Sequence, residues 1–183
     1  MKMGKEILKE LTIVTIGVFI ALFVNNIIQE KKNNSFVIKS LKLIEIEQNE
    51  NLEHLQNVIE SQDLFIEVLK KELNNNKLSF GDIVMKANGF SIPSISTTAW
   101  DKLLSNHLEL VEYNYIKSLN RIEKRVIFLE DIKSRLGEIA YENANQKDSE
   151  SKGLLLSLIQ DLKRAEISLV EDYKEFNQMN KNY

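Results

Sequence analysis

The stretch LTIVTIGVFIALFVNNII, residues 11–28, decides the fold of this chain. It carries no charged side chain, and the nearest charges are Glu10 before it and Glu30 after it. A helix of this length reaches about 27 Å, close to the ~30 Å hydrocarbon core of a bilayer. The hydroxyls of Thr12 and Thr15 can bond back to carbonyls of their own helix. We therefore expect a transmembrane helix at residues 11–28, preceded by a short basic tail at residues 1–10.

Two other interpretations of this stretch are a buried helix of a soluble protein and a cleaved signal peptide. The basic start and the apolar run fit a signal peptide. The residues that follow the apolar run, Phe23, Val24, Asn25 and Asn26, lack the small-x-small pattern of a cleavage site. An uncleaved anchor fits the stretch better.

Three residues of the expected span, Gly17, Ala21 and Asn25, are spaced by four and share one helix face. In lipid, small residues let two helix backbones approach, and an Asn side chain can hydrogen-bond across the contact. This face is a candidate site of helix association. The alternative is that Gly and Ala are simply common in membrane helices and that the headgroup region hydrates Asn25.

The orientation of the span follows from the lengths on its two sides. Lysines flank it at both ends, so the positive-inside rule gives no direction here. A short basic tail usually stays in the cytoplasm, and long domains cross largely regardless of charge. We expect a single-pass protein whose N-terminus is cytoplasmic and whose C-terminal domain is extracytoplasmic.

The composition excludes several protein classes. The 183 residues include 24 Lys+Arg, 27 Asp+Glu, one Pro, six Gly and no Cys. A disulfide scaffold and a cysteine zinc site are impossible without cysteine. A pI near 5.6 argues against a strongly basic nucleic-acid binder. So few Pro and Gly residues argue against a turn-rich β-sandwich, and an all-α fold is expected.

After a juxtamembrane connector at residues 29–34, residues 35–73 predict one long helix. Its apolar positions follow a 4,3,4,3 spacing, which is the heptad pattern of packed helices. These seam positions are Val37, Leu41, Ile44, Gln48, Asn51, Leu55, Val58, Gln62, Phe65 and Leu69. Polar layers in such a seam can set register and oligomeric state. Gln48, Asn51 and Gln62 are therefore candidate helix-association residues.

The remaining chain predicts two more long helices and a loop-rich stretch at residues 74–98. A short helix is expected near Asp82–Ala87, with Asp82 as its cap, and Trp100 is expected to anchor the stretch. Apolar stripes indicate a helix over roughly Tyr113–Asn143 and a last helix after Gly153. The simplest arrangement of residues 35–180 is an up-down-up three-helix bundle, with residues 74–98 packed across one end.

The sequence shows no constellation of an enzyme. His54 and His107 are isolated, no glycine-rich phosphate loop occurs, and no Ser lies in a nucleophile elbow. The acidic run Glu45, Glu47, Glu50 and Glu53 is typical of a solvated helix face. We expect no catalytic residue, no cofactor, no metal and no nucleic-acid partner.

Three motifs carry a resemblance to a known family. The first is Glu10, Gly17, Ile20, Ala21, Leu22, Asn25, Asn26 and Glu30 in the anchor; the second is Glu45, Ile46, Asn49 and Leu52; the third is Thr97, Trp100, Leu103 and Ser105. They resemble a bacterial family of small, single-span membrane proteins of unknown function. Ile27 departs from that pattern, because a Trp often follows the Asn pair there. The resemblance implies a membrane-anchored helical protein and supplies no activity.

These observations favour a membrane-anchored helical interaction or scaffold protein, oligomeric or part of a membrane complex. Its expected partners are the lipid bilayer and either a second copy or another membrane protein. One alternative is an extracytoplasmic sensor that relays a signal through a partner. The other is an effector that perturbs the membrane by oligomerising its span.

Overall fold

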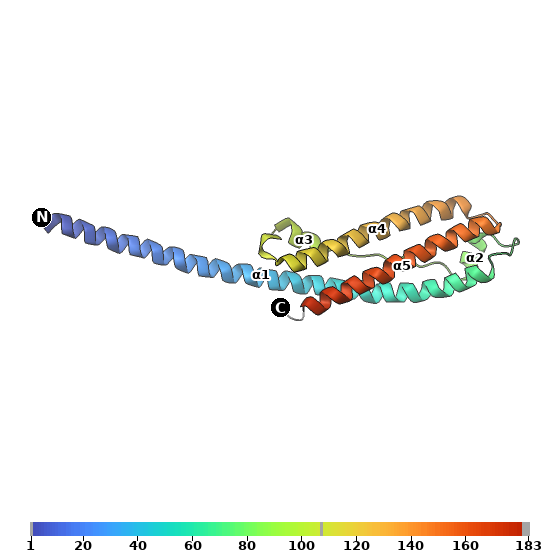
Figure 1. The fold of residues 1–183 in the computed structure, drawn as a ribbon, viewed down its shortest axis with the longest axis horizontal. Coiled ribbons are helices and arrows are strands. Elements are labelled where there is room, and N and C mark those ends of the chain that lie inside the picture. Colours follow the sequence, from blue (N-terminus) through green and yellow to red (C-terminus); the bar gives the residue numbers. More distant parts are fainter. Residues whose placement is uncertain (1, 107, 181–183) are drawn as a thin grey trace. The chain divides into compact units, whose positions relative to one another are not determined.

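The computed structural model describes the backbone of residues 2–106 and 108–180, and the side chains of residues 9–103 and 108–180. The described chain is helical and contains no strand, as expected. The elements run, in chain order, α1 (Lys2–Lys71), α2 (Phe80–Lys86), α3 (Thr98–Asn106), the short 3-10 helix η1 (Leu108–Leu110), α4 (Tyr113–Asn143) and α5 (Ser149–Asn180) (Figure 1). The chain divides into two compact units, Met1–Leu41 and Lys42–Tyr183, which are described in turn.

The first unit is the N-terminal part of α1. Residues 29–34, expected as a connector, are helical like their neighbours. No Pro or Gly interrupts this region, and side-chain hydrogen bonds one turn apart bridge it. The Asn26 amide donates to Glu30 (3.3 Å), and the Gln29 amide donates to Asn33 (3.3 Å). Such pairs stabilise a helix slightly.

The core of the second unit follows the predicted stripes. All eight seam positions of α1 from Ile44 to Leu69 are buried, including the three polar layers. The predicted bounds of α4 are confirmed. Its buried side chains and those of α5 occupy one face of each helix. Trp100 of α3 is also buried, at 4% exposure, although its indole N–H has no hydrogen-bond partner among the described atoms.

The directions of the long helices differ from the expected up-down-up order. Contacts of α5 pair Asn180 with Glu45 and Glu166 with Gln62, so α5 runs antiparallel to α1. The Tyr115 hydroxyl of α4 donates to the carbonyl of Met179 (3.2 Å), and Arg121 pairs with Asp172, so α5 is antiparallel to α4 as well. Residues 42–71 of α1 and helix α4 therefore run in the same direction.

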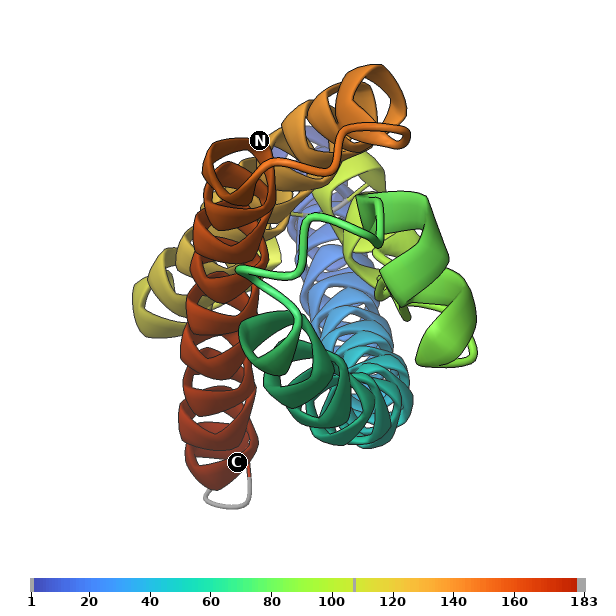
Figure 2. The same ribbon diagram turned by 90° about the vertical axis from the view of Figure 1, so that its right-hand side faces the viewer.

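The connection between these two parallel helices explains the difference. Residues 88–97 do not pack across one end but return along α1 in an extended conformation (Figure 1). Phe90 contacts Phe65 with ring centroids 5.0 Å apart, and Ser96 lies against Asn51. The chain is thus carried back before α4 begins. Figure 2 shows α2 and α3 on the side away from α5.

The start of α2 also differs from expectation. Helix α2 is capped by Ser79, whose hydroxyl accepts from the N–H of Asp82 (3.1 Å), while the Asp82 carboxylate accepts from the N–H of Ser79 (2.8 Å). This is a capping box, so Asp82 is its third residue rather than the cap. After α2 the chain turns through Asn88 (φ 60°) and Gly89 (φ 105°), conformations that Asn and Gly adopt most readily.

Helix α5 begins at Ser149, one turn before the expected start. The Asp148 carboxylate accepts from the N–H of Ser151 (2.7 Å), a bond that lowers the pKa of Asp148. Lys152 is fully buried beside it. Its ammonium group donates to the carbonyls of Glu72 (3.2 Å), Asn75 (2.9 Å) and Leu78 (3.3 Å), which follow the end of α1. Turn N–H groups also donate to the carbonyls of Glu72 (3.1 Å) and Asn75 (3.2 Å), so the cation is a second donor to these two and supplies the hydrogen bond of the Leu78 carbonyl.

Candidate functional site

The apolar stretch of α1 is the first candidate site. Its large apolar side chains between Leu11 and Ile28 are 37–68% exposed. It is the part of the described chain that is long and apolar enough to cross a membrane, and none of its most apolar window is buried. A core helix of a soluble protein is covered by its own chain, and this one is not. The Thr15 hydroxyl donates to the carbonyl of Leu11 (2.8 Å), which removes a polar group from the surface.

The small-residue face lies on this exposed rod. Gly17, Ala21 and Asn25 are all exposed. A methyl group added to Gly17 would meet no atom within 4 Å. The backbone at Gly17 is therefore open to a partner helix. Association through this face stays a prediction.

The three polar layers of the α1 seam lie inside the second unit. Gln48, Asn51 and Gln62 are buried in the core of the second unit, at 4%, 5% and 0% exposure. The Asn51 amide group donates to the carbonyl of Ser96 (2.8 Å) and accepts from its N–H (3.0 Å). Extended backbone without a neighbouring strand needs such partners. Asn51 and Gln62 therefore hold the returning segment of their own chain and are not displayed to a second one.

Gln62 also meets the most perturbed carboxyl group of the described chain. Its amide donates to Glu166 Oε1 (2.8 Å) and to the carbonyl of Ser91 (3.2 Å). Glu166 is fully buried, and burial raises its pKa to about 7, against smaller opposing effects of Gln62, Lys163 and Lys133. Glu166 Oε2 and Gln62 Oε1 have no hydrogen-bond partner. A proton on Glu166 Oε2 would give it a hydrogen to donate, so the neutral acid suits this site.

The acidic run of α1 divides into two parts. Glu47 accepts from the Ser96 hydroxyl and from the N–H of Ala99 (2.8 Å), at the start of α3. Glu45 accepts from the Asn180 amide (2.9 Å). Glu50 and Glu53 are exposed. The run therefore does not converge on one point, and no group of three metal-ligating side chains occurs among the described residues.

The two histidines are far from any such cluster as well. His54 is exposed, and its Nε2 accepts from the N–H of Ser94 (3.3 Å) on the returning segment. This bond gives His54 a structural role, although the sequence offered no sign of it. His107 lies outside the described residues.

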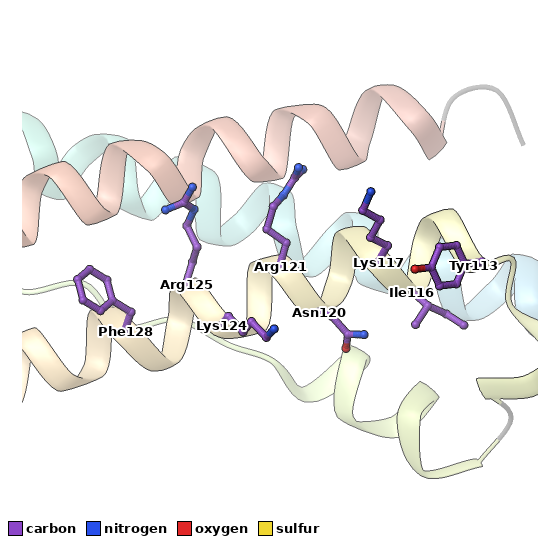
Figure 3. Close-up of a pocket in the computed structure, with 8 residues that line it drawn as sticks. All are labelled: Tyr113, Ile116, Lys117, Asn120, Arg121, Lys124, Arg125 and Phe128. Carbon is purple, nitrogen blue, oxygen red and sulfur yellow. The ribbon is translucent and has the colours of Figure 1, made fainter.

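A groove with a volume of about 570 Å³ lies along α4. Sequence analysis did not single it out, because its charges are spread along an otherwise ordinary amphipathic helix. Tyr113 and Phe128 stand at its two ends, and four cations lie between them (Figure 3): Lys117, Arg121, Lys124 and Arg125.

The four cations of the groove are not equivalent. Arg121 pairs with Asp172 (2.9 Å) and Glu175 (2.6 Å) of α5, and Arg125 also pairs with Asp172. Lys117 and Lys124 form no ion pair with any described residue. Figure 3 shows Lys117, Arg121 and Arg125 directed toward the side of α5, whereas Lys124 lies across α4 and does not extend toward α5. The lysines are therefore the charges left for a ligand or partner.

Comparisons of the chain with protein families, with curated proteins and with solved structures find no match.

Proposed function

We propose that this protein is a membrane-anchored helical interaction protein with no enzymatic role. Residues 11–28 would lie in the bilayer, and the unit of residues 42–180 would bind a partner beside the membrane. The observation that carries the proposal is the uncharged stretch from Leu11 to Ile28, which is exposed throughout and belongs to the same chain as a unit with a hydrophobic core of its own. Burying that much apolar surface in lipid is strongly favourable, at about 25 cal/mol per Å².

Membrane retention tests the anchor. We expect the full chain to stay in the membrane pellet after alkaline carbonate washing and to need detergent for release. The substitutions Val18→Glu and Phe19→Lys put two charges at the centre of the span, and each disfavours insertion by about 3 kcal/mol. This variant is expected in the supernatant. A matched control, Leu154→Glu with Tyr141→Lys, changes two exposed side chains of the second unit and should stay in the pellet.

Release of the unmodified chain by carbonate, without detergent, would contradict the anchor. The proposed orientation has the N-terminal tail in the cytoplasm and residues 42–180 outside it. A reporter enzyme that is active only outside the cytoplasm, fused after Tyr183, is expected to be active. Activity of a cytoplasm-specific reporter at the same position would reverse the orientation.

The exposed face of Gly17, Ala21 and Asn25 supports association of the spans themselves. A close approach of two backbones at Gly17 and Ala21 needs small side chains there. Replacing both residues by Ile is expected to lower self-association of the span in a membrane two-hybrid assay. Replacing Val18 and Leu22 by Ile leaves the small residues in place and serves as the control.

A further inference from the structure

We propose that the partner is a second copy of this chain, and that copies meet head to tail through two exposed helix faces. One is the face of α1 formed by Leu43, Ile46, Glu50, Glu53 and Asn57, called here the α1 acidic face. The other is the face of α4 formed by Tyr113, Ile116, Lys117, Lys124 and Phe128, called the α4 basic face. This inference rests on the proposed anchored function and names its partner.

The α1 acidic face lies away from the buried seam of the same helix. Its residues follow a heptad spacing of their own, and all five are exposed. Leu43 and Ile46 are 58% and 46% exposed, which is unusual for neighbouring large apolar side chains on one helix face. Glu50 and Glu53 follow on the next turns and form no ion pair among the described residues. The face is therefore apolar at one end and negative beyond it.

The α4 basic face has the same order with the opposite charge. Tyr113 is 75% exposed and lies beside Ile116 at the start of α4. Lys117 and Lys124 follow, unpaired, and Phe128 closes the groove (Figure 3). The face is apolar at its start and positive beyond it.

The two faces are also level with each other along the second unit. Both helices contact α5, so a residue of α1 and a residue of α4 that contact neighbouring residues of α5 lie at the same level along the unit. Asn180 reaches Glu45 of α1, and the carbonyl of Met179 accepts from Tyr115 of α4, so residues 45 and 115 are level.

One or two turns further on, α5 gives the same alignment. On the α1 side, Asn177 and Tyr173 of α5 form hydrogen bonds with Asn49 and Asn51. On the α4 side, Glu175 of α5 accepts a hydrogen bond from Arg121. Leu43 and Ile46 are thus level with Tyr113 and Ile116, and Glu50 and Glu53 are level with Lys117–Lys124.

The shared level matters for the symmetry of the contact. Residues 42–71 of α1 and helix α4 run in the same direction within the second unit, so rotation of a copy about an axis parallel to these helices keeps them parallel. In a ring around such an axis, a head-to-tail contact joins two different faces at the same level. The apolar ends then meet each other, and the glutamates meet the lysines. Confinement to the membrane raises the effective concentration of the copies, so a contact of a few turns suffices.

Disulfide cross-linking between two tagged full-length chains tests this contact in membranes. The chain has no cysteine of its own, so one chain carries only Ile46→Cys and the other only Ile116→Cys. We expect a cross-linked pair on mild oxidation. Pairing Ile46→Cys with Tyr141→Cys, an 86% exposed position on the far part of α4, is the control and should give about a tenth of that yield or less.

Charge reversal then tests the chemistry of the contact. Adding K117E and K124E to both chains makes both faces of the contact negative. Adding E50K and E53K to both chains makes both faces positive. Each is expected to lower the cross-linking yield about tenfold. Placing E50K and E53K on the Ile46→Cys chain and K117E and K124E on the Ile116→Cys chain restores opposite charges across the contact. The yield should then return, which a misfolded variant could not produce.

Carbonate washing of the same membranes separates the two proposals. A chain that is retained in the membrane but cross-links no better at Ile116→Cys than at Tyr141→Cys overturns the head-to-tail contact and leaves the anchored function standing. A cross-linking yield that charge reversal does not change overturns the contact as well. So does capture of a different acidic protein by a chain that is itself monomeric. Release of the chain from the membrane overturns both proposals.

Discussion

The buried carboxyl group of Glu166 makes the stability of the second unit depend on pH. Its pKa is about 7 in the folded chain, against an ordinary value of 4.5. Folding therefore favours the protonated acid, and the ionised form opposes folding. This contribution is most favourable below pH 4.5, is lost as the pH rises to 7, and stays at its unfavourable limit above that. The difference of the two pKa values corresponds to roughly 3 kcal/mol.

The substitution Glu166→Gln isolates this contribution. An amide keeps the shape of the protonated acid and carries hydrogens that can reach the unpartnered oxygen of Gln62. We expect the variant and the unmodified chain to be about equally stable at pH 4.5. At pH 8 the variant should be more stable by roughly 3 kcal/mol.

Urea unfolding of the detergent-solubilised full chain measures the difference, with fluorescence of the single, buried Trp100 as the signal. Taking the difference between two variants at each pH cancels the titration of the other carboxyl groups. Glu171→Gln, at an exposed position of the same helix, is the control and should change stability by less than about 0.5 kcal/mol at either pH. A Glu166→Gln effect of equal size at pH 4.5 and pH 8 would refute the reasoning.

Four further substitutions test other features of the second unit. Lys152→Met removes the ammonium donor of three carbonyls, of which that of Leu78 has no backbone donor among the described residues, and should lower the free energy of unfolding by about 2 kcal/mol in urea titration, whereas an unchanged midpoint would show that water replaces the ammonium group. Asn51→Leu removes the partners of Ser96 and should cost about 2 kcal/mol and increase proteolysis within residues 88–97; resistance of that segment to protease would contradict its attachment. Gly137→Ala, in open space within α4, should raise the thermal midpoint by the equivalent of about 1 kcal/mol, whereas Gly89→Ala, at φ 105°, should lower it.

Local patterns in the sequence predict the elements well where one rule acts alone. The exposed apolar stretch of α1 is an uncharged run in the sequence, and α4, Tyr113–Asn143, has the bounds expected around its apolar stripe. The start of α5 was harder to predict from the sequence, because Gly153 suggests that the helix begins after it. Asp148 supplies the real cap, and a Gly can lie within a helix when its neighbours continue it.

The partners of buried polar residues could not be predicted from local sequence patterns. A Gln or Asn in a heptad seam usually indicates contact with another helix, and Asn51 and Gln62 are therefore candidate helix-association residues in the sequence. Their true partners, Ser96 and Ser91, belong to a segment whose path no periodicity reveals. The raised pKa of Glu166 was equally hidden, because it comes from burial, and nothing in the residues around it distinguishes this carboxyl group from exposed ones.

The sequence by itself determined that the chain is helical, that residues 11–28 are apolar and uncharged, and that one face of each long helix is buried. These properties depend on side chains a turn or two apart, so they can be read along the chain. Only the tertiary structure decided that residues 88–97 return along α1, that α1 and α4 are parallel, and that glutamates and lysines are therefore exposed at one level. Those features depend on contacts between residues that are distant in the sequence, such as Asn51 with Ser96 and Gln62 with Glu166, and no local pattern encodes them.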